Sequence, residues 1–341
     1  MARVGIAFVG TGSIADYHLA GLGAVPNADV RVIVGRDADK TQAAAARYGI
    51  ADASVDLPTA LGRRDVEAVI IATPDDTHEA IAAEAADRGK AVLLQKPMAA
   101  DSSACRRIIA TAAAANVDLQ VSFMHRYFEE FRMARELVAD GAIGEVTSVR
   151  LRNATPGPDW ADWFFKKSRV AGGVVLQLGV HGIDLLTQMC GHVAAVSATT
   201  AILRAERLLA DGRRVAVENP DSAWAVYSMA NGTVASHEMS MIEARGCDRF
   251  RFEIYGTKGT IWLRSELGPL ALDCGDGKGW KMPVVPTPPF GQRQHQRWID
   301  GITGTKTRER TALDALNGIL IAEAIGRSSA VSGARVSVES A

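Results

Sequence analysis

The chain has 341 residues, of which 48% are hydrophobic and 23% are charged, a composition typical of a folded protein of two domains. Its 38 Lys and Arg residues against 39 Asp and Glu give a net charge of -1, so no basic surplus attracts nucleic acid or an anionic membrane. No apolar run approaches the roughly 18–20 residues of a membrane-spanning helix, and residues 1–12 lack the pattern of a signal peptide. We expect a cytoplasmic protein with no nucleic-acid or membrane partner.

The cysteines lie far apart in the sequence and form no Cys-x-x-Cys pair. They are Cys105, Cys190, Cys247 and Cys274. This spacing argues against a secreted disulfide framework and against a structural zinc site, so we expect no metal.

Over the first 122 residues, short apolar runs alternate with helix-like segments, a pattern typical of parallel βαβ units. The expected strands are 4–9, 30–34, 66–72, 91–94 and 119–122, and the expected helices are 13–24, 39–48, 76–88 and 102–115. Continuously apolar strands suit a sheet that is covered on both faces. Residues 1–122 are therefore predicted to form a doubly wound α/β domain.

Residues 123–341 show strands of alternating character instead, which favour an α+β domain with a large, mostly antiparallel open sheet. The expected elements are helix 128–139, strands 146–152, 223–229, 233–239, 250–255 and 260–263, a loop over 268–292 and helix 312–328. An apolar face on such a sheet needs a cover. We therefore predict a homodimer or a homotetramer.

A glycine-rich turn follows the first predicted strand and opens the next helix. It reads Gly10, Thr11, Gly12, Ser13, Ile14 and Ala15, and it fits the pattern G-x-G-x-x-G/A. In this pattern the first glycine makes the tight turn, the second lets the backbone approach a pyrophosphate, and the helix N-terminus faces the phosphates. These residues predict a dinucleotide-binding (Rossmann) domain.

The end of the second strand bears on the choice between NAD and NADP. It reads Val34-Gly35-Arg36-Asp37, so glycine stands where an acidic residue would bind an NAD ribose. Arg36 suits the 2′-phosphate of NADP, and this favours NADP. In the alternative, Arg36 is solvated and Asp37 holds the ribose of NAD.

Two later strands also end in polar residues at what should be the same edge of the sheet. Thr73 and Pro74 follow the third clear strand, with His78 close behind, and Gln95 and Lys96 end the next. Ligands lie at the carboxyl ends of such strands, so these residues are expected to line the cofactor site. A lysine there can donate or shuttle a proton if its surroundings lower its pKa.

In order and spacing, these motifs resemble the Gfo/Idh/MocA oxidoreductase family, which includes glucose–fructose oxidoreductase and inositol dehydrogenases. The resemblance continues over the rest of the chain through Arg126, Gly141–Val146, Gly172-Gly173, Gly179–Asp184, Ala322-Glu323-Ala324 and Arg327-Ser328. It implies a metal-free, nicotinamide-dependent dehydrogenase of sugars or polyols. Its substrate would lie between the first domain and the open sheet of the second.

The resemblance also implies the catalytic residues. The lysine of the Glu-Lys-Pro motif is Lys96, and the histidine of the Asp-x-x-x-His motif is His181. The chain departs from the family twice, because Gln95 replaces the glutamate and Gln177 replaces the aspartate. Gln177 can hydrogen-bond a substrate hydroxyl but cannot take its proton, so the acid–base task falls to His181, with Lys96 assisting.

Arg126 and Trp163 are expected to contact the substrate. His125, Trp160, Lys166, Lys167 and His295 are further candidates for the site, each with an equally good structural explanation. Two other functions remain open. One is a cofactor-binding regulator without turnover, and the other is a redox-assisted lyase or glycosidase that recycles its cofactor.

Overall fold

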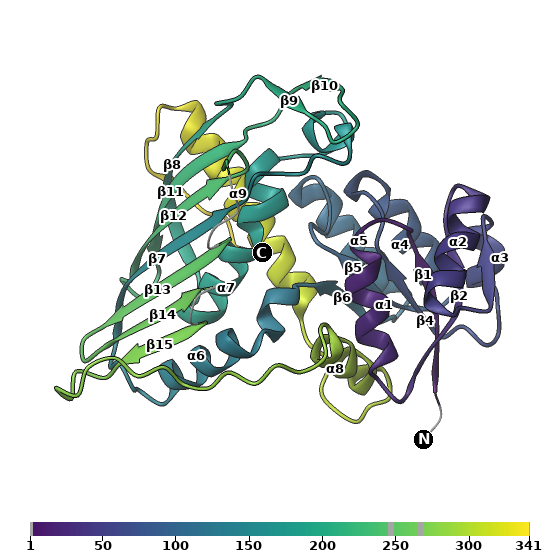
Figure 1. The fold of residues 1–341 in the computed structure, drawn as a ribbon, viewed down its shortest axis with the longest axis horizontal. Helices are drawn as coiled ribbons and strands as arrows, with labels where there is room; N and C mark the ends of the chain where they lie inside the picture. Colours follow the sequence, from purple (N-terminus) through teal and green to yellow (C-terminus); the bar gives the residue numbers. More distant parts are fainter. Residues whose placement is uncertain (1–2, 245–248, 265–268, 341) are drawn as a thin grey trace. The chain divides into compact units, whose positions relative to one another are not determined.

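A computed structural model describes residues 3–244, 249–264 and 269–340, which form two compact units (Figure 1). Unit 1 comprises Met1–Tyr127 and Thr287–Leu316, and unit 2 comprises Phe128–Pro286 and Asn317–Ala341. The predicted division at residue 122 thus differs from the observed one in two ways. The first segment runs on to Tyr127, and a later segment returns to unit 1.

Unit 1 contains a six-stranded parallel sheet with the strand order β3-β2-β1-β4-β5-β6. The strands are β1 (Val4–Val9), β2 (Ala28–Val34), β3 (Asp52–Ser54), β4 (Ala68–Ile71), β5 (Ala91–Gln95) and β6 (Leu119–Ser122). Every residue of β1 and β4 is buried, as expected for a sheet covered on both faces. This confirms the predicted doubly wound fold.

Helices cover both faces of this sheet (Figure 1). They are α1 (Ala15–Gly23), α2 (Ala38–Tyr48), α3 (Leu57–Leu61), α4 (His78–Asp87), α5 (Ser102–Ala114) and α8 (Gln292–Ile302). Leu19 and Leu22 of α1 share one apolar core with Phe8 of β1 and with Trp298 and Ile299 of α8. On the other face, α4 packs against α5, β4 and β5.

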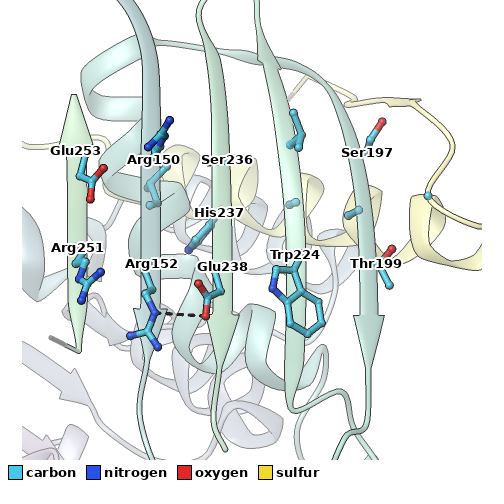
Figure 2. Close-up of a pocket in the computed structure, with 15 residues that line it drawn as sticks. Arg150, Arg152, Ser197, Thr199, Trp224, Ser236, His237, Glu238, Arg251 and Glu253 are labelled. Carbon is cyan, nitrogen blue, oxygen red and sulfur yellow. Dashed lines mark hydrogen bonds and ion pairs between the residues drawn. The ribbon is translucent and has the colours of Figure 1, made fainter. Parts of the chain in front are cut away.

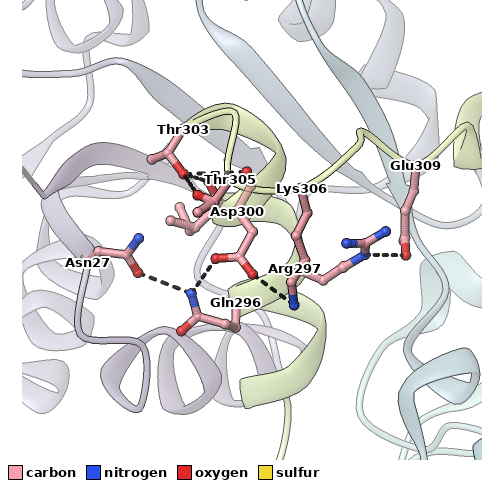
Figure 3. Close-up of polar contacts among 9 residues, drawn as sticks. Asn27, Gln296, Arg297, Asp300, Thr303, Thr305, Lys306 and Glu309 are labelled. Atoms are coloured by element: carbon pink, nitrogen blue, oxygen red, sulfur yellow. Dashed lines mark hydrogen bonds and ion pairs between the residues drawn. The ribbon is translucent and has the colours of Figure 1, made fainter. Parts of the chain in front are cut away.

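Helix α8 belongs to unit 1 although it lies near the end of the sequence. Trp298 is 1% exposed and fills the core beside α1. Polar contacts hold the outer side of the helix, as Figure 3 shows: Gln296 Nε2 donates to Asn27 Oδ1 at 3.2 Å and to Asp300 Oδ1 at 2.8 Å, and Arg297 pairs with Glu309 at 3.0 Å. These contacts explain why residues 287–316 return to the first unit.

Unit 2 is built on an eight-stranded sheet with the strand order β15-β14-β13-β7-β12-β11-β8-β16. Its strands are β7 (Val146–Ala154), β8 (Val193–Ala201), β11 (Ser222–Met229), β12 (Val234–Ser240), β13 (Phe250–Gly256), β14 (Thr260–Arg264), β15 (Leu270–Asp273) and β16 (Val336–Ser337). All neighbouring strands are antiparallel except β7 and β12, which pair in parallel. The predicted mostly antiparallel sheet is confirmed.

One face of the large sheet is covered by the helices α6 (Glu129–Ala139), α7 (Val180–Cys190) and α9 (Thr311–Ala330) (Figure 1). These helices contribute Phe131, Ile183 and Ile325, respectively, to an apolar core that also contains sheet residues such as Tyr227 and Phe252. The opposite face carries the alternate side chains, among them the exposed Trp224 and Val226 of β11. We call this second face the open face.

Several elements were not predicted from the sequence. The expected loop 268–292 is wrong in part, because β15 pairs with β14 inside it. Four residues are too few for alternation to stand out. Strand β8, the hairpin of β9 (Glu206–Leu208) and β10 (Arg214–Ala216), and helix α8 were also missed.

Among the described residues, no helix is long and apolar enough to cross a membrane. In the same ranges, no group of three or more His, Cys, Asp or Glu residues is placed to hold a metal ion. Cys105, Cys190 and Cys274 are free thiols, whereas Cys247 lies outside the described residues.

Candidate active site

The predicted dinucleotide loop lies at the carboxyl end of β1, against the neighbouring strand β4. Gly10 has φ +125°, and a Cβ on it would lie 2.3 Å from the carbonyl oxygen of Ala72. Its backbone N–H donates to Val34 O at 2.8 Å. The turn therefore requires glycine, both for its dihedral angle and for the close approach of two backbones.

The next residues of this loop fit a phosphate-bearing ligand. A Cβ on Gly12 would meet nothing within 4 Å, and Thr11, Gly12 and Ser13 are exposed. Ile14, the N-cap residue of α1, makes no side-chain hydrogen bond to the first turn of the helix. The N-terminus of α1 therefore presents backbone N–H donors, which suit an anion. Asp16 adds a negative charge in this turn, but Arg47 lies 3.0 Å from it and offsets that charge.

The segment after β2 shows why glycine precedes Arg36. A Cβ on Gly35 would lie 2.3 Å from Thr41 Oγ1 and 3.1 Å from Thr11 Cγ2, so no side chain fits there. Arg36 and Asp37 are both exposed. Asp37 caps α2, because its carboxylate accepts a hydrogen bond of 3.0 Å from the backbone N–H of Lys40.

His78 ties together the turns that follow β4 and β5. Its Nε2 lies 2.9 Å from the carbonyl oxygen of Thr73, and its Nδ1 lies 3.1 Å from Pro97 O and 3.2 Å from Met98 O. The ring is 1% exposed, and burial lowers its pKa. His78, which was predicted to line the cofactor site, thus places both ring nitrogens beside protein carbonyl oxygens and packs between Thr73 and the segment that follows Lys96.

Three neighbouring strands of unit 1 thus end in predicted site residues. The dinucleotide loop follows β1, Thr73 and Pro74 follow β4, and Gln95 ends β5 directly before the half-buried Lys96. Arg126 lies elsewhere in unit 1, where it pairs with Asp314 at 2.8 Å and its guanidinium lies 5.0 Å from the ring centroid of Phe123. This ion pair occupies part of the guanidinium that was expected to bind substrate.

In unit 2, Gln177 and His181 lie on one continuous helical segment. A single π-helical turn over Val175–Gly179 carries Gln177 and leads directly into α7, where His181 is 4% exposed. π-helical turns inside helices occur frequently at functional sites. This segment lies on the helix-covered face of the large sheet, opposite the open face.

Two glycines allow this segment to pack closely against the sheet. A Cβ on Gly179 would lie 2.2 Å from the sulfur of Met239, and one on Gly182 would lie 2.4 Å from Asn153 Oδ1 and 2.8 Å from His237 Cε1. Asn153 and His237 cannot easily move, because both are buried and Asn153 Oδ1 lies 2.7 Å from His237 Nε2. The position of His181 therefore depends on the glycine that follows it.

Trp163 belongs to an aromatic group ahead of the π-helical turn. Its ring stacks on Phe164 with centroids 3.8 Å apart, and Trp160 meets Phe164 edge-on at 5.8 Å. Phe165 anchors the group, since it packs with Leu209 and Val217. The candidates Lys166 and Lys167 are exposed, and Lys166 pairs with Asp162 at 2.8 Å.

A hollow of about 600 Å³ lies on the open face of the sheet, away from Gln177 and His181. Figure 2 shows side chains of both charges standing on neighbouring strands around Trp224. They include Arg150, Arg152, Arg251, Glu238 and Glu253. Arg152 pairs with Glu238 at 3.3 Å and with Glu243 at 2.8 Å.

Sequence reasoning missed His18 and left His295 as an exposed or site residue. Both rings are fully buried, and His18 Nδ1 lies 2.9 Å from His295 Nε2. The contact joins α1 to α8, residues that are 277 positions apart, and no local pattern predicts such a pairing. His125 is also buried, in the short helix Met124–Tyr127.

Two family models match most of the chain. Residues 4–123 match the model of an oxidoreductase family with an NAD-binding Rossmann fold, and residues 131–262 match the GFO/IDH/MocA C-terminal domain. The chain therefore belongs to the Gfo/Idh/MocA family of oxidoreductases, as the sequence motifs predicted.

Named relatives cover most of the chain. It is 28% identical to inositol 2-dehydrogenase of Rhizobium meliloti over 81% of this chain and 80% of the relative. It is 27% identical to levoglucosan dehydrogenase of Pseudarthrobacter phenanthrenivorans over 86% and 83% of the two chains. A solved structure of levoglucosan dehydrogenase with NADH and L-sorbose shares the fold, with a TM-score of 0.91, 23% identity and full coverage of both chains at 100%.

The close packing at Gly182 generates a prediction. Gly182→Ala places a Cβ against Asn153 and His237, so we expect the variant to lose about 1–3 kcal/mol of unfolding free energy, measured by urea denaturation. Gly326→Ala in α9 is the matched control, because its Cβ would meet nothing within 4 Å. Equal stability of the two variants would contradict the packing argument.

Proposed function

We propose that this oxidoreductase transfers a hydride between a bound nicotinamide dinucleotide and a secondary alcohol of a sugar or polyol. The observation that carries the proposal is the edge of the unit 1 sheet, where β1, β4 and β5 end in the dinucleotide loop, Thr73 and Lys96. The names of the relatives, inositol 2-dehydrogenase and levoglucosan dehydrogenase, support the substrate class.

In this proposal the cofactor is held by backbone and side chains of unit 1. The phosphates of the cofactor lie against the dinucleotide loop, because Gly12 leaves open space and the first turn of α1 offers N–H donors. The residues of this loop are Gly10, Thr11, Gly12, Ser13 and Ile14. Thr73, Pro74, Gln95 and Lys96 line the nicotinamide end. When bound, nicotinamide supplies the hydride acceptor for alcohol oxidation or the hydride donor for the reverse reaction.

The chain's own residues handle the proton and the substrate. His181 accepts the proton of the alcohol, a task that suits an imidazole because its ordinary pKa lies near neutral pH. The ammonium of Lys96 polarises the substrate oxygen. Gln177 donates or accepts a hydrogen bond to a neighbouring hydroxyl, and Arg126 and Trp163 add contacts to the substrate.

Removal of either catalytic group tests this assignment. In His181→Ala and Lys96→Ala we expect turnover to fall by about 10²–10⁴-fold, the usual contribution of a positioned acid or base, while NADH still binds. The exposed His192 and Lys278 provide the controls His192→Ala and Lys278→Ala, which should keep full turnover.

The same assay separates the two rival functions. A dehydrogenase accumulates reduced cofactor in proportion to the substrate consumed, whereas a redox-assisted lyase or glycosidase converts substrate without net reduction. A regulator binds cofactor and turns over nothing, and it would leave both alanine variants indistinguishable from the parent protein.

We further propose that Arg36 gives the site a preference for NADP. The carboxylate of Asp37 is engaged as the cap of α2, whereas Arg36 is exposed beside it at the end of β2. A guanidinium binds a phosphate through two parallel hydrogen bonds. The levoglucosan dehydrogenase structure contains NADH, so the two cofactors are best compared directly.

A fluorescence titration with NADPH and NADH makes this comparison. We expect tighter binding of NADPH, and Arg36→Ala should weaken NADPH by about 10–100-fold, the value of a charged hydrogen bond of 1.5–3 kcal/mol. Binding of NADH by the same variant serves as the internal control. Equal or tighter binding of NADH by the parent protein would instead assign the ribose to Asp37.

We also propose that the open face joins copies of the chain into a homodimer or homotetramer. Trp224 and Val226 are 45% and 48% exposed in the hollow on this face, which arginines and glutamates also line. A face with both charges can be complementary to itself about a two-fold axis. Large apolar side chains that are exposed together on a sheet are typical of a surface that another protein molecule covers.

Light scattering at micromolar concentration should give two or four copies per particle. Trp224→Glu should dissociate the assembly, whereas Val55→Glu, at an exposed apolar residue of unit 1, should not. A monomeric parent protein would refute this proposal.

A further inference from the structure

A buried hydrogen-bonded pair on the large sheet faces the helical segment that carries His181. His237 of β12 and Asn153 of β7 are 2% and 1% exposed, and their strands are the parallel neighbours of this sheet. Asn153 Oδ1 lies 2.7 Å from His237 Nε2, and Tyr227 Oη of β11 lies 3.1 Å from His237 Nδ1. We call Asn153, His237 and Tyr227 the buried His237 network.

Gly182, the residue after His181, packs directly on the hydrogen bond between His237 and Asn153. The three atoms nearest to a Cβ on Gly182 would be Asn153 Oδ1 at 2.4 Å, His237 Cε1 at 2.8 Å and His237 Nε2 at 2.9 Å. All three belong to the two partners of that hydrogen bond. The distance of α7 from the sheet at Gly182, and with it the place of the adjacent His181, therefore depends on this pair.

The side-chain oxygen of Asn153 fixes the direction of both hydrogen bonds in the network. An amide oxygen only accepts, so His237 Nε2 carries a hydrogen and donates it. In an uncharged ring Nδ1 is then bare, and it accepts from the hydroxyl of Tyr227. Asn153 Nδ2 has no hydrogen-bond partner among the described residues, so in this part of the chain the contact with His237 orients the amide.

Burial keeps the network uncharged. It lowers the pKa of His237 to about 3, and it raises the pKa of Tyr227, whose ring centroid lies 6.0 Å from that of His237. The titratable groups of α7 next to Gly182 are the buried His181 and Asp184. The residues opposite His237 on the two neighbouring strands carry no charge, and they are Leu151 and Ala225.

We propose that His237 is a positioning residue for His181. Its uncharged ring donates from Nε2 and thereby holds Asn153 Oδ1 in the place against which Gly182 packs. The inference rests on the catalytic role proposed for His181. It also gives a reason for glycine at position 182, because a Cβ there would intrude on the hydrogen bond between His237 and Asn153.

NMR of the parent protein tests the direction of the hydrogen bonds. With ¹⁵N-labelled histidine, the ring of His237 should be uncharged and protonated on Nε2 at pH 7, with its signals assigned by their loss in His237→Gln. An imidazolium at pH 7 would overturn the proposal. So would an Nδ1–H tautomer, because Asn153 would then have to present its N–H2 group to His237.

The stability of the chain as a function of pH tests the burial of the ring. His237 has a folded-state pKa of about 3 against an ordinary value of 6.5, so between these values the unfolded chain binds a proton that the folded ring refuses. The unfolding free energy of the parent protein, taken relative to that of His237→Gln, should be level above about pH 6.5 and should fall as the pH drops from there toward 3. A difference that stays constant over this range would contradict a buried, uncharged His237.

Kinetics test the link to His181. His237→Leu removes the donor at Nε2, so we expect kcat to fall at least ~10-fold, since a small misplacement of a catalytic group is costly. The NADH dissociation constant should stay within ~3-fold, because the proposed cofactor site is in unit 1. His237→Gln keeps an N–H2 group as a donor for Asn153 Oδ1, and its kcat should stay within ~3-fold of the parent value.

Ile261→Ala separates positioning from a general loss of stability. Ile261 is 0% exposed on β14 and belongs to the same apolar core, so its truncation lowers the unfolding free energy without touching the network. We expect this variant to keep the kcat of the parent protein. A kcat of His237→Leu equal to that of Ile261→Ala would refute the positioning role.

Gly182→Ala tests the same contact from the side of the helix and does not require His237→Leu to fold. Its added Cβ intrudes on the pair, so kcat should fall at least ~10-fold, whereas Gly326→Ala should keep the parent value. Equal kcat in the two alanine variants would show that the packing of Gly182 on His237 and Asn153 does not position His181.

The proposed function and this inference fail in different ways. If His181→Ala keeps full turnover, the proposed function fails while the NMR result on His237 stands. If His181→Ala abolishes turnover but His237→Leu and Gly182→Ala turn over like their controls, only the positioning role of His237 fails.

Discussion

The close approach of two backbones at Gly10 is the constraint on which the candidate cofactor site depends. Because the Ala72 carbonyl occupies the space of a side chain at Gly10, the ends of β1 and β4 come together. His78 then joins the turn after β4 to the turn after β5 by three contacts to carbonyl oxygens. The ends of three strands are thereby held close to one another. The exposed loop from Thr11 to Ser13 comes directly after one of these ends, and the half-buried Lys96 comes directly after another.

In the second unit, glycines likewise allow a close approach, here between a helical segment and the large sheet. Gly179 and Gly182 remove the side chains that would separate the segment carrying His181 from β7 and β12. These two strands are the parallel pair in an otherwise antiparallel sheet, and parallel neighbours need a crossover connection. The aromatic group around Trp163, Gln177 and His181 all lie on the connection that leaves β7 and enters β8, before the chain returns through β11 to β12.

The sequence predicted those features that depend on local pattern. Continuous apolar strands, alternating strands and the Gly10–Ala15 turn each follow from a short stretch of residues, so both sheets and the dinucleotide loop were found. Helix α8 was missed because its sequence is mostly polar, and its few apolar residues such as Trp298 fill a core built from the start of the chain. The pairing of His18 with His295 and the π-helical turn at Gln177 likewise depend on tertiary contacts that no window of sequence contains.

The discontinuity of unit 1 has a consequence for synthesis of the protein on the ribosome. The strands of its sheet are complete at Ser122, but the helix that covers Leu19 and Leu22 and supplies the partner of His18 follows only after all strands of unit 2 except the short β16. Until then the nascent sheet exposes apolar surface on that face, a condition that favours aggregation. Completion of the cofactor-binding unit is thereby made one of the last events of biosynthesis, and a chain truncated before residue 287 lacks that cover.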